Sequence, residues 1–213
     1  MAQLNIENRV IENERIVLGR EDIAFLGPDL TLRGCTVTIR VTARNLILIR
    51  PRLIDCIIEV KQELKNLRWY RAFLKGCRFT GTMSGNDFGL WPVEEGAEKT
   101  LGGIEEAART LGGIEDCDFS GARLDACRFV NCDVDTLKLP SWPCFTFLAP
   151  THRQRELLAA PWPGTSRITV EAMLKSPPET AAVTFSAPAV AKYGGTTEES
   201  LRAVLQTLDG VRF

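Results

Sequence analysis

Several features that mark common protein classes are missing from this sequence. No apolar run approaches the roughly 18 residues that a membrane-spanning helix needs, so we expect no transmembrane helix. Met1 to Arg9 is polar and charged, which argues against a secretory signal. The net charge of −1 gives no overall attraction to nucleic acid or to membranes. Together these absences predict a cytoplasmic protein without a membrane partner.

The residues that common active sites need are also scarce. The chain has one histidine, His152, and Cys144 is the cysteine most readily paired with it as a nucleophile. Neither a G-x-G-x-x-G motif nor a P-loop occurs, so no nucleotide site is expected. The cysteines are not spaced as four clustered zinc ligands. We therefore expect no catalytic residues, no metal and no cofactor.

What the sequence does contain is a ladder of evenly spaced cysteines. Cys35, Cys56 and Cys77 recur at a constant step of about 21 residues, which lies in the range of solenoid repeats. Apolar residues keep the same step around them: Leu32, Leu53 and Leu74 before, and Val37, Ile58 and Phe79 after. Such a period, with several apolar positions in phase, is typical of a solenoid. In-phase cysteines are expected to be small buried side chains with free thiols.

A shorter period appears later in the chain. Large apolar residues recur every five positions, at Ile114, Phe119, Leu124, Phe129, Val134 and Leu139. A step of five fits neither a helix nor an alternating strand, but four five-residue sides make a square coil of about 20 residues. The two periods predict one inward-facing set: Leu32, Cys35, Val37, Leu53, Cys56, Ile58, Leu74, Cys77, Phe79, Cys117, Phe119, Leu124, Cys127 and Phe129.

The two periods share a frame that an insertion interrupts. Leu74 and Cys77 match Ile114 and Cys117 at an offset of 40, and the same offset places Gly81 opposite Gly121. The offset equals one coil plus a Gly- and Glu-rich segment at about 91–110. This insertion is expected to be either an irregular extra coil or a helical excursion.

Five-residue units within 67–81 and 112–139 resemble the repeats of pentapeptide repeat proteins. Two such units are Cys117-Asp118-Phe119-Ser120-Gly121 and Ala122-Arg123-Leu124-Asp125-Ala126. The resemblance implies a right-handed quadrilateral β-helix, and we assign residues 1–149 to it. The expected fold class is mainly β: this solenoid, with coils of about 20–21 residues, and a C-terminal α/β cap.

The C-terminal segment, residues 150–213, loses both periods and is predicted to cap the solenoid. Its last helix begins with a capping-box pattern of Thr196 and Glu199, and Gly210 is a plausible stop. Weaker helices are expected at 153–160 and 170–175, with a short strand at 181–185. The apolar stripe of the last helix is expected to pack on the solenoid end or to form a homodimer. The stripe comprises Leu201, Val204, Leu205 and Leu208.

Charge is strongly segregated along the chain. Residues 40–78 hold ten Lys/Arg and three Asp/Glu, a net of +7, whereas residues 87–118 hold nine Asp/Glu and two Lys/Arg, a net of −7. In coils of constant length the cations stack in pairs and form a basic ladder, which we predict to bind an acidic protein surface rather than nucleic acid. Two tryptophans that precede prolines are further candidate anchors. The candidate partner-binding residues are Arg40, Arg44, Arg50, Lys61, Lys65, Arg71, Trp91 and Trp142.

These features favour a non-enzymatic interaction or scaffold protein that binds another protein through an outer face of the β-helix. The alternative is an immunity or inhibitor protein against a toxin or enzyme. The family resemblance includes members that resemble duplex DNA and protect DNA gyrase, but their acidic faces contrast with the basic coils here. A β-helix enzyme ranks last, because grouped carboxylates on one regular face are missing.

Overall fold

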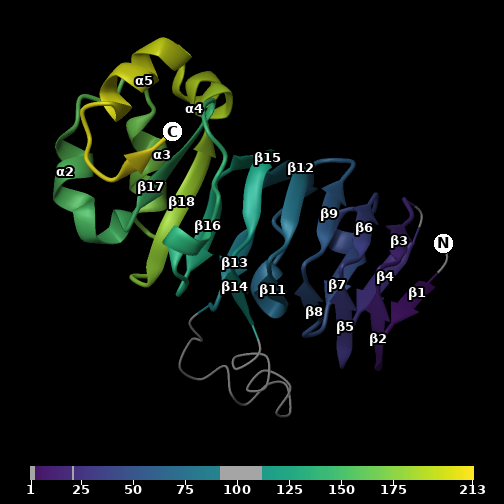
Figure 1. Ribbon diagram of the computed structural model, residues 1–213. Helices are drawn as coiled ribbons and strands as arrows, with labels where there is room; N and C mark the ends of the chain where they lie inside the picture. The colour runs from purple at the N-terminus through teal and green to yellow at the C-terminus, as the bar shows by residue number, and fades with distance from the viewer. Residues whose placement is uncertain (1–2, 21, 92–111) are drawn as a thin grey trace, which may run out of the picture.

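The structure is a computed structural model of the chain, and it describes residues 3–20, 22–91 and 112–213. Figure 1 shows a stack of short strands that begins at the N-terminus and a group of helices at the opposite end of the stack. The fold is mainly β: a solenoid of parallel strands followed by a C-terminal α/β cap, as the sequence predicts. No helix in the described ranges has the length and apolar character needed to cross a membrane.

Three sets of parallel strands form sides of the solenoid, and partner strands come from successive coils. The first side contains β1 (Gln3–Ile6), β4 (Ile23–Leu26) and β7 (Leu46–Leu48). The second side contains β2 (Arg9–Glu12), β5 (Leu30–Arg33), β8 (Arg52–Ile54), β11 (Phe73–Lys75) and β14 (Gly113–Glu115). The third side contains β3 (Arg15–Leu18), β6 (Thr36–Ile39), β9 (Ile57–Val60), β12 (Arg78–Ser84) and β15 (Asp118–Asp125). A short strand, β10 (Leu64–Lys65), pairs with the end of β12.

The corners before the cysteine positions need a left-handed backbone, and the sequence supplies residues that tolerate it. At the corner between the second and third sides, these residues are Asn13, Gly34, Asp55, Gly76 and Asp116, with φ between 54° and 62°. Asn, Asp and Gly adopt this conformation at lower cost than other residues. The chain can therefore turn every few residues without breaking the pairing between coils.

The predicted inward-facing residues are all buried. Each ladder cysteine donates its thiol to a backbone carbonyl of the preceding coil: Cys56 Sγ lies 3.4 Å from Leu32 O, and Cys77 Sγ lies 3.3 Å from Leu53 O. Aromatic rings fill the later coils, where Phe79 and Phe119 stack at 4.6 Å between ring centroids. Burial of these side chains stabilises the solenoid by roughly 1.5–3 kcal/mol for each large apolar residue.

The frame continues across residues 92–111, which lie outside the described part. The predicted insertion at about 91–110 falls almost entirely within that range. β11 pairs with β14 at an offset of 40, with Leu74 opposite Ile114. The register then shifts between Arg78 and Thr80, so Gly81 lies opposite Ala122. The prediction that Gly81 matches Gly121 is therefore wrong by one residue, because a bulge adds one position to β15.

The C-terminal segment covers the last coil with a mixed sheet. β18 (Thr180–Ser186) pairs antiparallel with β16 (Cys127–Val130) on one edge and with β17 (Cys144–Leu148) on the other. β13 (Asp87–Gly89) and β19 (Val211–Arg212) complete this sheet. β17 precedes the expected boundary after residue 149, yet Phe145 and Phe147 pack in the C-terminal core. The strand predicted at 181–185 is confirmed within β18.

Four helices complete the cap: α2 (Gln154–Ala159), α3 (Arg167–Met173), α4 (Ala187–Gly194) and α5 (Glu198–Leu205). Leu201 and Leu205 of α5 are fully buried in the cap, so much of the predicted stripe packs within the chain. The N-cap of α5 is Thr197, whose hydroxyl accepts a hydrogen bond from Ser200 N. The prediction of Thr196 as N-cap is therefore wrong by one residue. A homodimer through this segment stays a prediction.

Candidate interaction surface

The six predicted cations occupy three different positions around the coil. Arg40 follows β6 and Lys61 follows β9 on the third side, where Lys61 N donates to Ile39 O at 2.9 Å. Arg44 lies in the short helix η1 (Ala43–Asn45), just before β7, and Lys65 lies in β10 one coil later. Because these positions fall on different sides of the coil, the six cations do not form a single ladder.

Arg50 and Arg71 lie together at the corner between the first and second sides. Arg50 follows β7, and its backbone N donates to Arg71 O at 3.0 Å. Arg71 is the last residue of the short helix η2 (Trp69–Arg71). The expected stacking of Arg50 and Arg71 is therefore present as a backbone contact between successive coils.

The two lysines of the set have carboxylate partners within the solenoid. Lys61 Nζ lies 3.2 Å from Glu59 Oε2, and Lys65 Nζ lies 3.1 Å from Glu63 Oε2. The pKa of Glu59 is lowered, first by the hydrogen bond from the Thr38 hydroxyl and then by Lys61. Within the described ranges, no ion pair includes Arg40, Arg44, Arg50 or Arg71. Among the described residues, these four arginines therefore have no carboxylate partner, in contrast to the two lysines.

The first side also carries an apolar outer row that the sequence reasoning did not select. Ala24 and Leu26 of β4 and Leu46 and Leu48 of β7 are buried, so the alternate residues Phe25 and Ile47 face outward. Phe25 lies directly opposite Ile47 in the parallel register. Both side chains are half-buried. The sequence does show an apolar run through β7, but such a run alone does not tell which of its side chains face outward.

Aromatic residues lie in the next coils. Tyr70 follows Trp69 in η2 and Trp91 follows β13, and the rings of Tyr70 and Trp91 stack with 5.6 Å between their centroids. The guanidinium of Arg128 lies 4.5 Å from the centre of the Trp91 ring and is held by Asp87 through distances of 2.7 and 3.1 Å. Ile49 occupies the position equivalent to Tyr70 in the preceding coil. Trp91 is thus fixed against the solenoid at one end of the apolar row.

We call this region the β7 surface. Its apolar centre consists of Phe25, Ile47, Ile49, Tyr70 and Trp91, and its rim consists of Arg44, Arg50, Arg68 and Arg71. Arg68 precedes η2 and forms a parallel bridge with Asp87. The β7 surface therefore brings together four of the predicted residues, namely Arg44, Arg50, Arg71 and Trp91. Arg40, Lys61 and the ion-paired Lys65 lie outside it.

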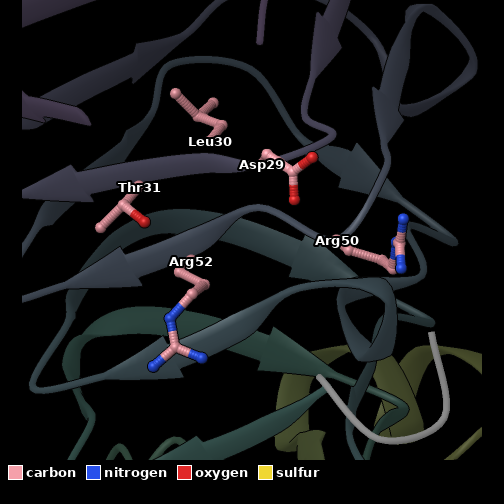
Figure 2. A pocket seen from close by; sticks show the side chains of 5 residues that line it. All are labelled: Asp29, Leu30, Thr31, Arg50 and Arg52. Atoms are coloured by element: carbon pink, nitrogen blue, oxygen red, sulfur yellow. The ribbon is translucent and has the colours of Figure 1, made fainter. Parts of the chain in front are cut away.

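A hollow of about 260 Å³ lies at the Arg50 edge of the β7 surface. It is lined by Asp29, Leu30, Thr31, Arg50 and Arg52. Figure 2 shows that Arg50 and Arg52 extend in different directions, with the Asp29 carboxylate on the neighbouring coil. Arg52 lies 4.5 Å above the Phe73 ring, whereas the Nε atom of Arg50 is buried and has no hydrogen-bond partner in the described structure.

Trp142 belongs to a different part of the molecule. It packs against the C-terminal core, with its ring centroid 6.2 Å from that of Phe213. The guanidinium of Arg202 in α5 lies 4.9 Å from the Trp142 ring. Trp142 therefore fixes the last helix and the chain end against the cap, and it does not adjoin the β7 surface.

The thiols and the histidine were the candidates for chemistry. Cys144 is buried, its Sγ donates to Leu124 O at 3.5 Å, and burial raises its pKa. His152 is exposed shortly after strand β17, in the short helix η5 (Pro150–Arg153). A buried thiol with a raised pKa is a poor nucleophile. Among the described residues, no group of three or more His, Cys, Asp or Glu side chains is arranged to hold a metal ion.

Comparison of the chain with known protein families, with curated protein sequences and with solved structures found no match.

Proposed function

We propose that this protein is a non-enzymatic, pentapeptide-repeat-like interaction protein that binds an acidic surface of another protein through the outside of its solenoid. The observation that carries the proposal is the set of arginines on the β7 surface that have no ion-pair partner among the described residues. The parallel strands hold these positions in a fixed arrangement. A fixed positive potential attracts acidic partners and increases their association rate.

The state of the cysteines fits a cytoplasmic setting for this function. All seven are free, and six of them are buried. Free thiols are common where glutathione and thioredoxin keep proteins reduced. The proposal therefore includes a cytoplasmic partner.

Isolation of a partner with the tagged protein tests the proposal. We expect a stoichiometric complex by size-exclusion chromatography with light scattering, and an association rate that falls as salt increases from 50 to 300 mM. If the captured protein is a toxin or an enzyme that loses its activity in the complex, the protein is an inhibitor within the proposed class. Turnover of a small-molecule substrate by the purified chain, without a stable complex, contradicts the proposal.

A further inference from the structure

We infer that the β7 surface is the docking site and that its partner is a protein segment with a large apolar side chain flanked by carboxylates. This inference rests on the proposed function and specifies its site and its partner chemistry. It departs from the basic ladder expected from the sequence, because five of the nine residues that form this surface are apolar or aromatic.

The composition of the β7 surface is that of a binding interface. Five half-buried apolar or aromatic side chains form its centre, and the four arginines, three of them exposed, lie close to them along the chain. Aromatic residues and arginine are enriched in interfaces and dominate their binding energy, whereas lysine is depleted. Lysines of the same coils lie outside the β7 surface and have their own carboxylates, as Lys75 does with Glu115 at 2.9 Å.

The charge of the rim specifies carboxylates. Arg44 precedes Ile47 and Arg50 follows it, so cations lie at both ends of the outer face of β7. Arg68 and Arg71 flank Trp69 and Tyr70 in the next coil, and both arginines are exposed. A guanidinium binds a carboxylate through two parallel hydrogen bonds, which gives both strength and orientation. The hollow beside Arg50 leaves room for one side chain at this edge.

The same surface is poorly suited to nucleic acid. Bases bind to open aromatic faces, but the Trp91 ring is already in contact with Tyr70 and with the Arg128 guanidinium. The aliphatic side chains of Ile47 and Ile49 offer no stacking platform. A protein segment satisfies both the apolar centre and the rim.

The test is selection of a random 12-residue peptide display library on the immobilised wild-type protein at 150 mM salt. We expect enriched peptides in which Asp or Glu flanks an aromatic or large aliphatic residue. A fluorescein-labelled copy of the most enriched peptide is then titrated against two matched variants. Phe25→Ser/Ile47→Ser changes the β7 surface, and Val17→Ser/Ile57→Ser removes two exposed apolar side chains from the outer face of the third side.

We expect the Kd to rise at least about tenfold for Phe25→Ser/Ile47→Ser and less than about twofold for the control variant. Equal melting temperatures for the two variants exclude loss of the fold as the cause. Enrichment of basic peptides, or displacement of the peptide by a 20-nucleotide single-stranded DNA, overturns the inference. If acidic peptides bind but only the control variant weakens them, the proposed function survives and the β7 surface is the wrong site. If no peptide is enriched and no partner protein forms a complex, both are wrong.

Discussion

Asn86 occupies the position in its coil that Cys127 occupies in the next, and its amide replaces the thiol. Cys127 Sγ donates to Met83 O at 3.4 Å, and Asn86 Nδ2 donates to Leu64 O at 2.8 Å. A backbone hydrogen bond links the two coils at this point: Arg128 N, next to Cys127, donates to Asn86 O at 2.9 Å. Asn86 adds one bond that a thiol does not provide: its Oδ1 accepts from the buried Trp69 indole at 3.1 Å.

This relationship predicts a large effect of Asn86→Ala. The substitution leaves the buried Trp69 indole N–H without its acceptor and removes the side-chain hydrogen bonds to Leu64 O and Ser84 O. An unpaired buried polar group costs about 1–3 kcal/mol, and each lost hydrogen bond adds to that. We expect the free energy of unfolding to fall by about 2–4 kcal/mol. Asn86→Cys restores a donor to Leu64 and should cost less than Asn86→Ala. Urea denaturation measures both, and equal stability of all three proteins contradicts the role of the amide.

The buried thiols predict slow alkylation of the folded protein. The hydrogen bond with the Cys117 thiol is the largest cause that raises the pKa of Cys77 to about 12, and burial raises the pKa of Cys127 to about 12. At pH 8 such a thiol is about one part in ten thousand thiolate, the form that reacts with iodoacetamide. We expect modification within minutes only after unfolding, with the half-buried Cys132 reacting first among the native thiols. Mass spectrometry of labelled peptides checks the order.

The same shifts predict how stability depends on alkaline pH. An unfolded thiol has a pKa of about 8.5, so the folded pKa values of Cys77 and Cys127 are raised. Their contribution is fully present below about pH 8.5 and is lost as the pH rises toward 12. Between pH 9 and pH 10 the free energy of unfolding should therefore fall more steeply than in a Cys77→Ala/Cys127→Ala variant. If the free energy of unfolding falls with pH at the same rate in the wild type and in this variant, the raised pKa values of Cys77 and Cys127 are contradicted.

Asp125 links the solenoid to the cap and predicts a titration in acid. Its carboxylate accepts a hydrogen bond from Ser186 N at 3.1 Å, and burial raises its pKa. A raised pKa means that the charged form is costly in the folded state, so protonation below the folded pKa stabilises the fold. Asp125→Asn keeps an acceptor without the charge. It should be at least as stable as the wild type at pH 7, with an advantage that shrinks toward pH 4.

Asp118 provides the opposite control for Asp125. The hydrogen bond from Ser120 is the first cause that lowers the pKa of Asp118. Its contribution to stability is present above pH 3.8, the ordinary value, and is lost as the pH falls through the folded pKa. Asp118→Asn should therefore lower stability at pH 7. The deficit of Asp118→Asn should persist at pH 4 and disappear only below pH 3.8. A urea midpoint at pH 7 that is equal to or higher than that of the wild type would contradict the assignment for Asp118.

The coil was predictable from the sequence because every coil has to bury the same positions. A parallel strand has its partner one coil away, so a residue such as Leu53 must repeat at Leu32 and Leu74 to keep the core continuous. The bulge in β15 between Asp118 and Gly121 was not predictable, since one extra residue within a strand changes no apolar position that precedes it. Helix α4 was missed for a related reason: Ala187, Pro188 and Gly194 give little periodic signal.

The candidate site was predicted only in part. The constant step between coils relates Arg50 to Arg71, but it does not say which corner of the coil each pair of cations occupies. Arg40 and Arg50 are separated by about two sides of a square coil, so they face different directions. The apolar centre was not predicted, because in the sequence Phe25 and Ile47 resemble core residues. Only the burial of the residues on either side of them shows that they face outward.

The N-cap of α5 predicts a contrast between two adjacent threonines. Thr197 Oγ1 accepts from Ser200 N at 3.2 Å, whereas Thr196 precedes the cap. Thr197→Ala should lower the free energy of unfolding by about 1 kcal/mol, and Thr196→Ala should change it by less than half of that. Thermal unfolding of the two variants measures the difference. A larger loss for Thr196→Ala would restore the capping box predicted from the sequence.

The most direct test of the account compares two charge-matched double variants in the peptide titration. Arg44→Gln/Arg71→Gln removes two cations from the rim of the β7 surface, and Arg40→Gln/Lys61→Gln removes two from the third side. We expect the labelled acidic peptide to lose affinity about tenfold or more with the first variant and to bind nearly as well as before to the second. Equal losses for both variants, or a greater loss for Arg40→Gln/Lys61→Gln, would contradict the assignment of the β7 surface as the binding site.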